Sequence, residues 1–500
     1  MPSASSLLLR GGLTLAAVCG SLAASAAIPS SERTALTDLF EKAGGANWTN
    51  NANWCDGACP PLGHFGSLGT ECQWNGIICD DAGEHVVQIN LAANNLVGQL
   101  PQTLSSLANL MRLDLGNNQL EYGIPTLASL TNLQYFDVSR NHLSGTIPAL
   151  TGLTNLRYFD VGSNLLAGPI PELAGLTNLK FFGANSNPLN SPIPPLTGLT
   201  NLRYFYVGFS QLTGEIPMLA GLTNLQEFDV SYNQLTGPIP ALANLTNLWY
   251  FDVSNNQLTA IPALTGLTNL EHFYASLNQL TGTIPTLTGL TNLQYFYVTS
   301  NQLTGTIPTL TGLMNLQYFD VDSNQLTGTI PTLTDLTNLR HFDGGYNHLI
   351  GTIPPLIGLT NLQYFDVYSN QLTGAIPALA GLTNLQHFAV DSNQLTGTIP
   401  TLAGLTNLQH FYVNSNQLTG TIPALTGLTS LSEFYVGKNQ LSGFVPDVVA
   451  PGIPQFAGLC PNLLTLVDDP DWDIATGYTP WWSESGGECD ILFQAGFDVP

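Results

Sequence analysis

Tyrosine and aspartate recur in this chain at two positions of a 23-residue unit, on either side of a phenylalanine, as in Tyr135-Phe136-Asp137. A tyrosine ring offers an apolar face with a polar tip, and a carboxylate accepts hydrogen bonds from hydroxyls, amides or cations. The two columns therefore suit contact with a glycan chain or with a basic, extended polypeptide. The predicted ligand-binding residues are Tyr135, Asp137, Tyr158, Asp160, Tyr204, Tyr206, Asp229, Tyr250, Asp252, Tyr295, Tyr297, Tyr318, Asp320, Asp343, Tyr364, Asp366 and Tyr412.

A plainer interpretation of these columns stays open. Tyrosine is a good strand residue, and cross-strand rows of tyrosine and aspartate are tolerated on a solvated sheet. Duplication of one unit would also copy a column without selecting it. The sequence favours a binding surface, but it does not decide between the two interpretations.

Histidines share the tyrosine column but are interspersed with tyrosines, at His272, His341, His387 and His410. For these we expect an ordinary exposed role or a pH-tuned contact rather than metal binding. Asp469-x-Asp471-x-Asp473 resembles the opening of a calcium loop, but Ile474 stands where glycine is needed and Pro480 where the closing glutamate should be. We therefore predict no metal site and no cofactor.

The carboxylates form a repeated column and not a singular arrangement of acid, base and nucleophile, so we expect no enzymatic activity. The chain has no phosphate loop, zinc motif or serine nucleophile elbow. A catalytic site should break the repeat at one place. The breaks are mild: Ser210 with Phe209, a missing glycine near Ala260, and Gly344-Gly345.

The elements that must position these side chains repeat sixteen times between Ile89 and Leu441. An asparagine marks almost every unit, from Asn94 to Asn439, with Ser210 in place of one copy and a single 22-residue step between Asn256 and Asn278. A fixed period in this range is typical of a stack of similar coils that bury their apolar faces only against their neighbours.

Within one coil, Phe136 and Val138 alternate with polar residues, which predicts a short strand with one buried face. Asn141 follows at the corner, where we expect its side chain to hydrogen-bond backbone groups of its own and adjacent coils. Ile147, Leu150 and Leu153 should complete the core, and the frequent Gly and Pro make long helices on this return side improbable.

The pattern Leu-x-x-Leu-x-Leu-x-x-Asn-x-Leu, followed by Gly-x-Ile-Pro, resembles leucine-rich repeats of the plant type, as in plant receptor kinase ectodomains and polygalacturonase-inhibiting proteins. Trp48, Trp54 and Cys72-Gln-Trp74-Asn-Gly76-Ile-Ile-Cys79 resemble the cap that precedes such repeats. The resemblance implies an α/β-type solenoid: a curved horseshoe or superhelix whose parallel sheet lines an exposed concave face, with a helical N-terminal cap and a C-terminal cap. Units of 23 rather than 24 residues depart from the plant pattern.

The two ends indicate export. Residues 1–27 have Arg10, a short apolar run and a small-residue cleavage site, which predicts a signal peptide. The remaining segments are an N-terminal cap at 28–85, repeats at 86–446 and a C-terminal cap or tail at 447–500. We expect a secreted or extracellular protein, or a periplasmic or cell-surface one if the source is bacterial, with no membrane span.

Of the seven cysteines, six remain once Cys19 leaves with the signal peptide, which suits disulfides in an oxidising compartment. Sequence proximity favours the pairs Cys55–Cys59, Cys72–Cys79 and Cys460–Cys489, although other connectivities stay possible. Zinc is a weaker interpretation because the cysteine spacings match no common zinc module.

The 34 acidic against 10 basic residues argue against a nucleic-acid partner, which needs basic patches. We expect a monomer that binds a protein, a peptide or a polysaccharide. One alternative is an inhibitor of a secreted cell-wall hydrolase. Another is an ice- or surface-binding array of Thr-x-Thr rows, formed by Thr281, Thr283, Thr304, Thr306, Thr327, Thr329, Thr396, Thr398, Thr419 and Thr421.

Overall fold

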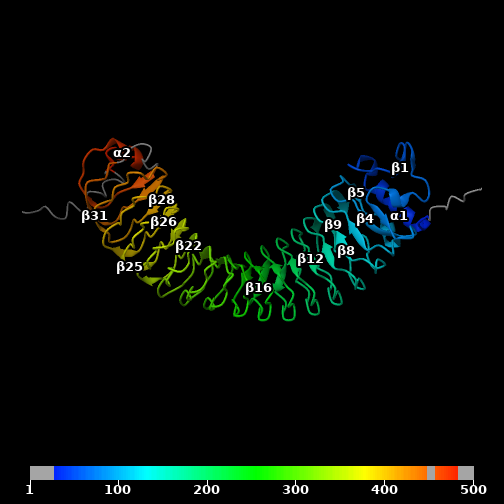
Figure 1. Ribbon diagram of the computed structural model, residues 1–500, viewed down its shortest axis with the longest axis horizontal. Coiled ribbons are helices and arrows are strands. Elements are labelled where there is room, and N and C mark those ends of the chain that lie inside the picture. Colours follow the sequence, from blue (N-terminus) through cyan, green and yellow to red (C-terminus); the bar gives the residue numbers. More distant parts are fainter. Residues whose placement is uncertain (1–26, 448–455, 482, 484–500) are drawn as a thin grey trace, which may run out of the picture.

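A computed structural model describes residues 27–447, 456–481 and 483, and it shows an open arc of stacked coils (Figure 1). Helix α1 (Ser30–Lys42) and β1 (Cys55–Asp56) lie at one end of the arc and α2 (Pro470–Thr476) at the other. The predicted signal peptide lies almost wholly outside the described residues. Among those residues, the longer α-helix has 13 residues, and no helix is long and apolar enough to cross a bilayer.

One sheet runs the length of the arc, in which each coil adds one strand parallel to and in register with the last. Its first strand, β3 (Ile77–Cys79), is antiparallel to β4. The parallel strands of this main sheet are β4 (Val86–Asn90), β6 (Arg112–Asp114), β8 (Tyr135–Asp137), β10 (Tyr158–Asp160), β12 (Phe181–Gly183), β13 (Tyr204–Tyr206), β15 (Glu227–Asp229), β17 (Tyr250–Asp252), β19 (His272–Tyr274), β20 (Tyr295–Tyr297), β21 (Tyr318–Asp320), β22 (His341–Asp343), β24 (Tyr364–Asp366), β26 (His387–Ala389), β28 (His410–Tyr412), β30 (Glu433–Tyr435) and β32 (Phe456–Gly458).

Further short parallel strands follow most corners, and they form several small sheets beside the main one. They are β5 (Val97–Gln99), β7 (Gln119–Tyr122), β9 (His142–Gly145), β11 (Leu165–Leu166), β14 (Thr213–Glu215), β16 (Gln234–Gly237), β18 (Gln257–Leu258), β23 (Ile350–Gly351), β25 (Gln371–Ala375), β27 (Gln394–Thr396), β29 (Thr419–Gly420), β31 (Gln440–Gly443) and β33 (Leu463–Leu464). From β22 onward, the main sheet lies on the inner side of the arc, with β25 and β31 on the outer side (Figure 1). The predicted solenoid with a concave parallel sheet is confirmed.

The core consists of the predicted apolar positions. In one coil Leu133, Phe136, Val138, Leu143 and Leu150 are fully buried. The phenylalanines of successive strands stack face to face along the core, from Phe136–Phe159 at 5.2 Å between ring centroids to Phe411–Phe434 at 5.7 Å. A stacked pair contributes about 0.5–1.5 kcal/mol beyond the area that it buries. From residue 107 to 447 the chain forms no helix, as the Gly and Pro content predicts.

The asparagine ladder joins neighbouring coils as predicted. The Asn141 side-chain oxygen accepts a hydrogen bond from the Leu120 N–H of the preceding coil at 2.8 Å. Its amide nitrogen donates to the carbonyls of Leu115, also in the preceding coil, and of Val138, at 3.1 and 3.0 Å. Asn462 makes the equivalent bonds beyond Leu441, so the solenoid continues one coil into the segment predicted as the C-terminal cap.

The N-terminal cap closes the first coil with an aromatic cluster and two disulfides. Trp54 packs against Phe40, Trp48 and Trp74 with centroid distances of 5.5, 5.1 and 4.8 Å. Short elements complete this cap and the first turn beyond it: η1 (Gly45–Asn47), β2 (His64–Phe65), η2 (Glu71–Gln73) and η3 (Gln102–Ser106). These contacts bury the apolar end of the stack that the first coil would otherwise expose.

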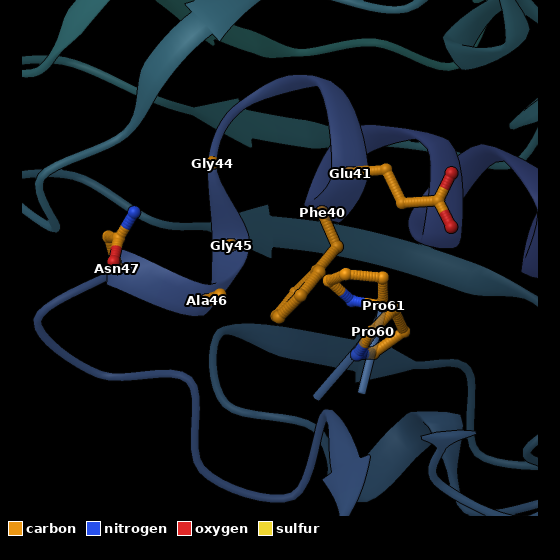
Figure 2. A pocket seen from close by; sticks show the side chains of 8 residues that line it. All are labelled: Phe40, Glu41, Gly44, Gly45, Ala46, Asn47, Pro60 and Pro61. Carbon is orange, nitrogen blue, oxygen red and sulfur yellow. The ribbon is translucent and has the colours of Figure 1, made fainter. Parts of the chain in front are cut away.

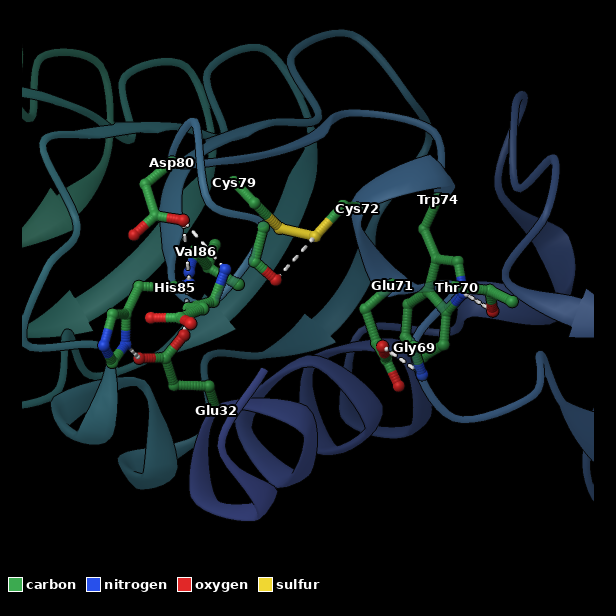
Figure 3. Close-up of a disulfide and its surroundings, with 12 residues drawn as sticks. Glu32, Gly69, Thr70, Glu71, Cys72, Trp74, Cys79, Asp80, His85 and Val86 are labelled. Carbon is green, nitrogen blue, oxygen red and sulfur yellow. Dashed lines mark hydrogen bonds and ion pairs between the residues drawn. A yellow bond between two sulfur atoms is a disulfide. The ribbon is translucent and has the colours of Figure 1, made fainter. Parts of the chain in front are cut away.

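Two buried carboxylates fasten α1 to the cap and to the first parallel strand. Glu32 accepts hydrogen bonds from the His85 ring at 2.8 Å and from the Val86 N–H at 2.7 Å (Figure 3). Glu71 pairs with Arg33 and also accepts from the Gly69 N–H at 2.9 Å. Both carboxylates are therefore satisfied despite their burial.

The structure contains the predicted disulfides Cys55–Cys59 and Cys72–Cys79, the second of which lies beside the Glu32–His85 contact (Figure 3). Of the third predicted pair, Cys460 packs against the core, whereas Cys489 lies outside the described residues.

Candidate functional site

All seventeen predicted ligand-binding residues lie on one face of the main sheet, at the first or third position of their strands. Register pairing places like residues side by side, as in Tyr135 beside Tyr158 and Asp137 beside Asp160. The middle residue of each strand points into the core, and the seventeen predicted residues beside it are half-buried, except Asp366, which is buried. We call this face of β8 to β28 the Tyr/Asp ribbon. Its side chains are less exposed than the sequence suggests.

The first column of the ribbon contains runs of stacked rings. Tyr135, Tyr158 and Phe181 stack with successive centroid distances of 4.3 Å. Farther along, His341 stacks on Tyr364 at 4.3 Å, and Tyr364 on His387 at 4.1 Å. Parallel strands are about 4.8 Å apart, so large rings in register must lie against one another. The rings in these runs therefore present edges and polar tips to solvent, and much of each apolar face is covered.

The aspartates of the third column bind their own backbone, a role that the sequence did not reveal. In each of the seven predicted positions, Oδ1 accepts a hydrogen bond from the N–H two residues later, at 2.8–3.1 Å. In four strands Oδ2 also lies 3.2–3.3 Å from the hydroxyl of the tyrosine two residues earlier. These carboxylates thus fix the end of each strand as well as facing solvent.

Burial shifts the ionisation of several groups in the ribbon. It raises the pKa of Asp160 to about 6 and, together with the neighbouring Asp366 carboxylate, that of Asp343 to about 8. It lowers the pKa of His341 to about 4. At neutral pH the ribbon therefore carries less charge than a count of its titratable residues implies.

The ribbon is hollowed near its middle by a pocket of about 380 Å³. The pocket is lined by Tyr232, Tyr250, Asp252, Ser254, Asn255, Tyr274, Ser276 and Tyr297. Tyr250, Tyr274 and Tyr297 come from three successive strands, β17, β19 and β20. Apolar walls with a few polar groups are typical of ligand pockets, and the volume is within the usual range.

Exposed apolar side chains border this pocket at the corner that ends each strand. Phe209 and Tyr232 stack at 4.1 Å, although 57% and 49% of their surfaces are exposed. Leu277, two corners farther on, is 52% exposed. All three residues have positive φ, at 55°, 52° and 56°, which is uncommon for bulky side chains. Serine is the commonest residue at this position in the other coils, as at Ser186, although Arg140, Tyr346 and Lys438 also occupy it.

Two breaks of the repeat flank the pocket. Ser210 follows Phe209, and its hydroxyl donates to the carbonyls of Ala184 and Gly208 at 3.2 and 3.0 Å, which replaces part of the asparagine's bonding. The 22-residue step lies on the other side, between Asn256 and Asn278. The pocket therefore occupies the stretch where the coils are least alike.

A second pocket, of about 300 Å³, lies in the N-terminal cap (Figure 2). Phe40, Pro60 and Pro61 form its apolar wall, and Gly44 and Gly45 its backbone wall. Glu41 is the only ionisable side chain in the lining, and its carboxylate points away from Phe40 (Figure 2). With few convergent polar groups, this pocket is the weaker candidate site.

The threonine rows form a less regular array than expected. Bridges join Thr283 to Thr304 and Thr306 to Thr327, an offset of 21 residues rather than the 23 of the main sheet. Each Thr-Gly-Thr therefore pairs its second threonine with the first of the next coil. Ile350 and Ala375 interrupt the array between the two threonine blocks, so it is not one continuous flat surface.

Sequence reasoning missed part of the pocket. Tyr232 was not predicted, because it lies at a corner rather than in either column, and Tyr274 was left out of the predicted set. The available signal is a bulky aromatic residue in two successive units, Phe209 and Tyr232, at a position where serine is the commonest residue of the repeats.

Known proteins match both the repeats and the fold. Sequence models described as "Leucine Rich repeats (2 copies)" and "Leucine Rich Repeat" match residues 223–266 and residues 132–152 and 315–335. A solved structure described as a TDR receptor is 31% identical, with a TM-score of 0.71, and the match covers 77% of this chain and 70% of that one. The chain belongs to the leucine-rich repeat family, in its plant-type subclass.

Two further solved structures are similar to this leucine-rich repeat protein. The plant peptide hormone receptor RGFR1 in complex with RGF2 is 33% identical, with a TM-score of 0.68 over 75% of this chain and 66% of that one. The Arabidopsis receptor kinase HAESA ectodomain, in complex with an N-terminally extended IDA peptide hormone ligand, is 28% identical, with a TM-score of 0.54 over 87% of each chain.

Proposed function

We propose that this leucine-rich repeat protein is an exported, non-catalytic binding protein that takes an extended polypeptide along the Tyr/Asp ribbon. The central pocket would hold one apolar or aromatic side chain of that polypeptide, and the acidic column would contact its basic groups. The two disulfides of the N-terminal cap support export, because such bonds persist in oxidising compartments.

The observation that carries the proposal is the pocket between β17 and β20 with its exposed aromatic border. Aromatic residues in a hollow are the usual centre of an interface, where a few side chains supply most of the binding energy. Phe209 and Tyr232 expose apolar surface beside the pocket, at a corner that has positive φ throughout the repeats and where serine is the commonest residue.

The stacked rings favour a polypeptide over a polysaccharide. A sugar ring binds best against an open aromatic face, whereas in the stacked runs of the first column these faces are covered by neighbouring rings. Edges, hydroxyls and carboxylates remain available, and these suit backbone amides and basic side chains. Two of the similar structures are a plant peptide hormone receptor and a receptor in complex with a peptide hormone ligand, which agrees with the proposed class.

The proposal predicts that the mature chain selects linear peptides from a random display library, and that Phe209→Ser with Tyr232→Ser abolishes the enrichment. Serine is the residue of neighbouring coils at this corner, so the double variant should fold. We expect the affinity of a selected peptide to fall at least about tenfold, as for the loss of a hot-spot aromatic residue. Isothermal titration calorimetry with that synthetic peptide measures the change.

Phe444→Ser is the matched control, because Phe444 is 67% exposed and lies on the return side near the C-terminal end, far from the pocket. Its affinity should equal that of the wild type. If the peptides bind the double variant as tightly, the pocket is not the site. Binding to a polysaccharide array without peptide enrichment would contradict the proposed ligand class.

A further inference from the structure

A cluster of ionisable side chains lies on the ribbon where strands β21 and β22 pair, next to the third break of the repeat at Gly344-Gly345. Asp320 on β21 is the register neighbour of Asp343 on β22, and His341 precedes Asp343 by two residues on the same face. A ring nitrogen of His341 and one carboxylate oxygen from each aspartate lie within 4.8 Å of one another.

The groups of this cluster are held in place by their surroundings. The His341 ring lies between Tyr318 and Tyr364, with centroid distances of 5.8 and 4.3 Å. Asp343 Oδ1 accepts from the Gly345 N–H at 3.0 Å, and Asp320 Oδ1 from the Asp322 N–H at 3.1 Å. These bonds orient the two carboxylates and leave the second oxygen of each without a hydrogen bond among the described residues.

The cluster also contains polar atoms that are buried and unpaired. His341 Nε2 and Asp322 Oδ1 are shielded from solvent and have no hydrogen-bond partner among the described residues. Among the described residues, no lysine or arginine forms an ion pair with Asp320, Asp322 or Asp343. A buried polar atom without a partner costs about 1–3 kcal/mol, a cost that a bound cation would remove.

Gly345 allows Tyr368 and Asp322 to pack closely over the backbone next to the cluster. A Cβ atom at this position would lie 2.9 Å from Asp322 Oδ1 and 2.3 Å from the Tyr368 ring. Most other coils carry a side chain here, such as Ser254 or Thr299. The Tyr368 ring and the Asp322 carboxylate therefore occupy the space that a side chain at this position would need, and a glycine is required for them to pack here.

Only one of the four histidines of the column has this environment. His272, His387 and His410 are followed two residues later by Tyr274, Ala389 and Tyr412, whereas His341 is followed by Asp343. The cluster is therefore not a by-product of the repeat, which would have copied it to other coils.

We propose that Asp320, His341 and Asp343 bind one divalent transition-metal ion of the Zn²⁺ or Mn²⁺ class. Imidazole suits Zn²⁺, and carboxylates suit Mn²⁺, so a mixed set of one nitrogen and two oxygen ligands selects ions that accept both. This differs from the sequence prediction, which treated the histidine column as a whole and found no metal site. The site does not depend on what fills the central pocket.

The test is isothermal titration calorimetry of the tag-free mature chain with Zn²⁺ and Mn²⁺, and with Ca²⁺ and Mg²⁺ for comparison. We expect about one tight site for a transition metal. Since loss of a supporting residue typically weakens metal binding about 10–100-fold, the loss of a direct ligand in His341→Asn or Asp343→Asn should weaken it at least about 100-fold. His272→Asn, in the same column but flanked by tyrosines, should bind as the wild type does.

A second measurement tests the nitrogen ligand directly. Pulsed electron paramagnetic resonance of the Mn²⁺-loaded wild type should show coupling to a histidine nitrogen, and Asn in place of His341 should remove it. Absence of binding below about 1 mM metal, or wild-type affinity in both ligand variants, would overturn the proposal. Metal bound without nitrogen coupling would overturn the assigned ligand set.

Discussion

Asp160 illustrates how a residue of the ribbon serves both the fold and the surface. Its Oδ1 accepts from the Gly162 N–H at 2.8 Å, and its Oδ2 lies 3.3 Å from the Tyr158 hydroxyl. The side chain must be half-buried to reach both groups, and burial raises its pKa to about 6. The bonds favour the ionised carboxylate, but the loss of solvent outweighs them.

Asp160→Asn should therefore change the dependence of stability on pH. A carboxyl whose pKa is higher in the folded state is protonated more readily there, so its stabilising effect is complete below about pH 4 and is lost as pH rises through about 6. Asparagine keeps the acceptor for Gly162 and does not ionise. We expect the variant to match the wild type at pH 4 and to exceed it at pH 7 by about 1–3 kcal/mol.

Urea unfolding followed by circular dichroism at both pH values checks this expectation, with the exposed Asp335→Asn as the control. An unchanged difference between Asp160→Asn and the wild type at pH 4 and pH 7 would contradict the assigned cause.

At the scale of the element, each coil depends on a side chain that pairs its backbone with that of the coil before. Asn141 binds the Leu120 N–H and the carbonyls of Leu115, Val138 and Ser139. These groups lie at a corner where strand pairing cannot satisfy them. The coil of Ser210 forms with fewer of these hydrogen bonds, because the serine hydroxyl donates to two carbonyls in place of the asparagine side chain.

Asn141→Ala should leave several buried backbone groups unpaired and destabilise the chain by about 3 kcal/mol or more, since each such group costs about 1–3 kcal/mol. Asn141→Ser should cost less, because a serine at this corner reaches two carbonyls in the Ser210 coil. The midpoint of urea unfolding ranks the two variants against the wild type. Equal midpoints for alanine and serine would show that the carbonyl contacts contribute little.

For the molecule as a whole, charge opposes the compact state. The chain has a formal net charge of −24, and its ribbon carries rows of aspartates at the spacing of adjacent strands. Like charges on neighbouring strands repel, and salt reduces this repulsion because the screening length falls from about 30 Å at 0.01 M to about 8 Å at 0.15 M.

Thermal unfolding should therefore shift upward by a few degrees when NaCl is raised from about 0.01 to 0.15 M. KCl should raise the unfolding temperature as much as NaCl does if screening is the cause, since specific ion binding would differ between the two salts. Protein treated with a chelator serves for both measurements, so that the proposed metal site does not contribute. A transition temperature that falls with salt would show that attractive ion pairs outweigh the repulsion.

The sequence by itself determined the solenoid, because a 23-residue period with buried Leu, Phe, Val and Asn leaves each coil one way to cover its apolar face. It also placed the predicted residues in the columns of the ribbon, and proximity along the chain favoured two disulfide pairs that the structure contains. The tertiary structure decided what the columns can do. Strand spacing stacks the rings and covers their faces, while the end of each strand engages the aspartates. Two sites arise where unlike coils meet: the pocket around Tyr250 and the Asp320–His341–Asp343 cluster. The sequence could not reveal them, because only packing fixes the distance between side chains of different coils.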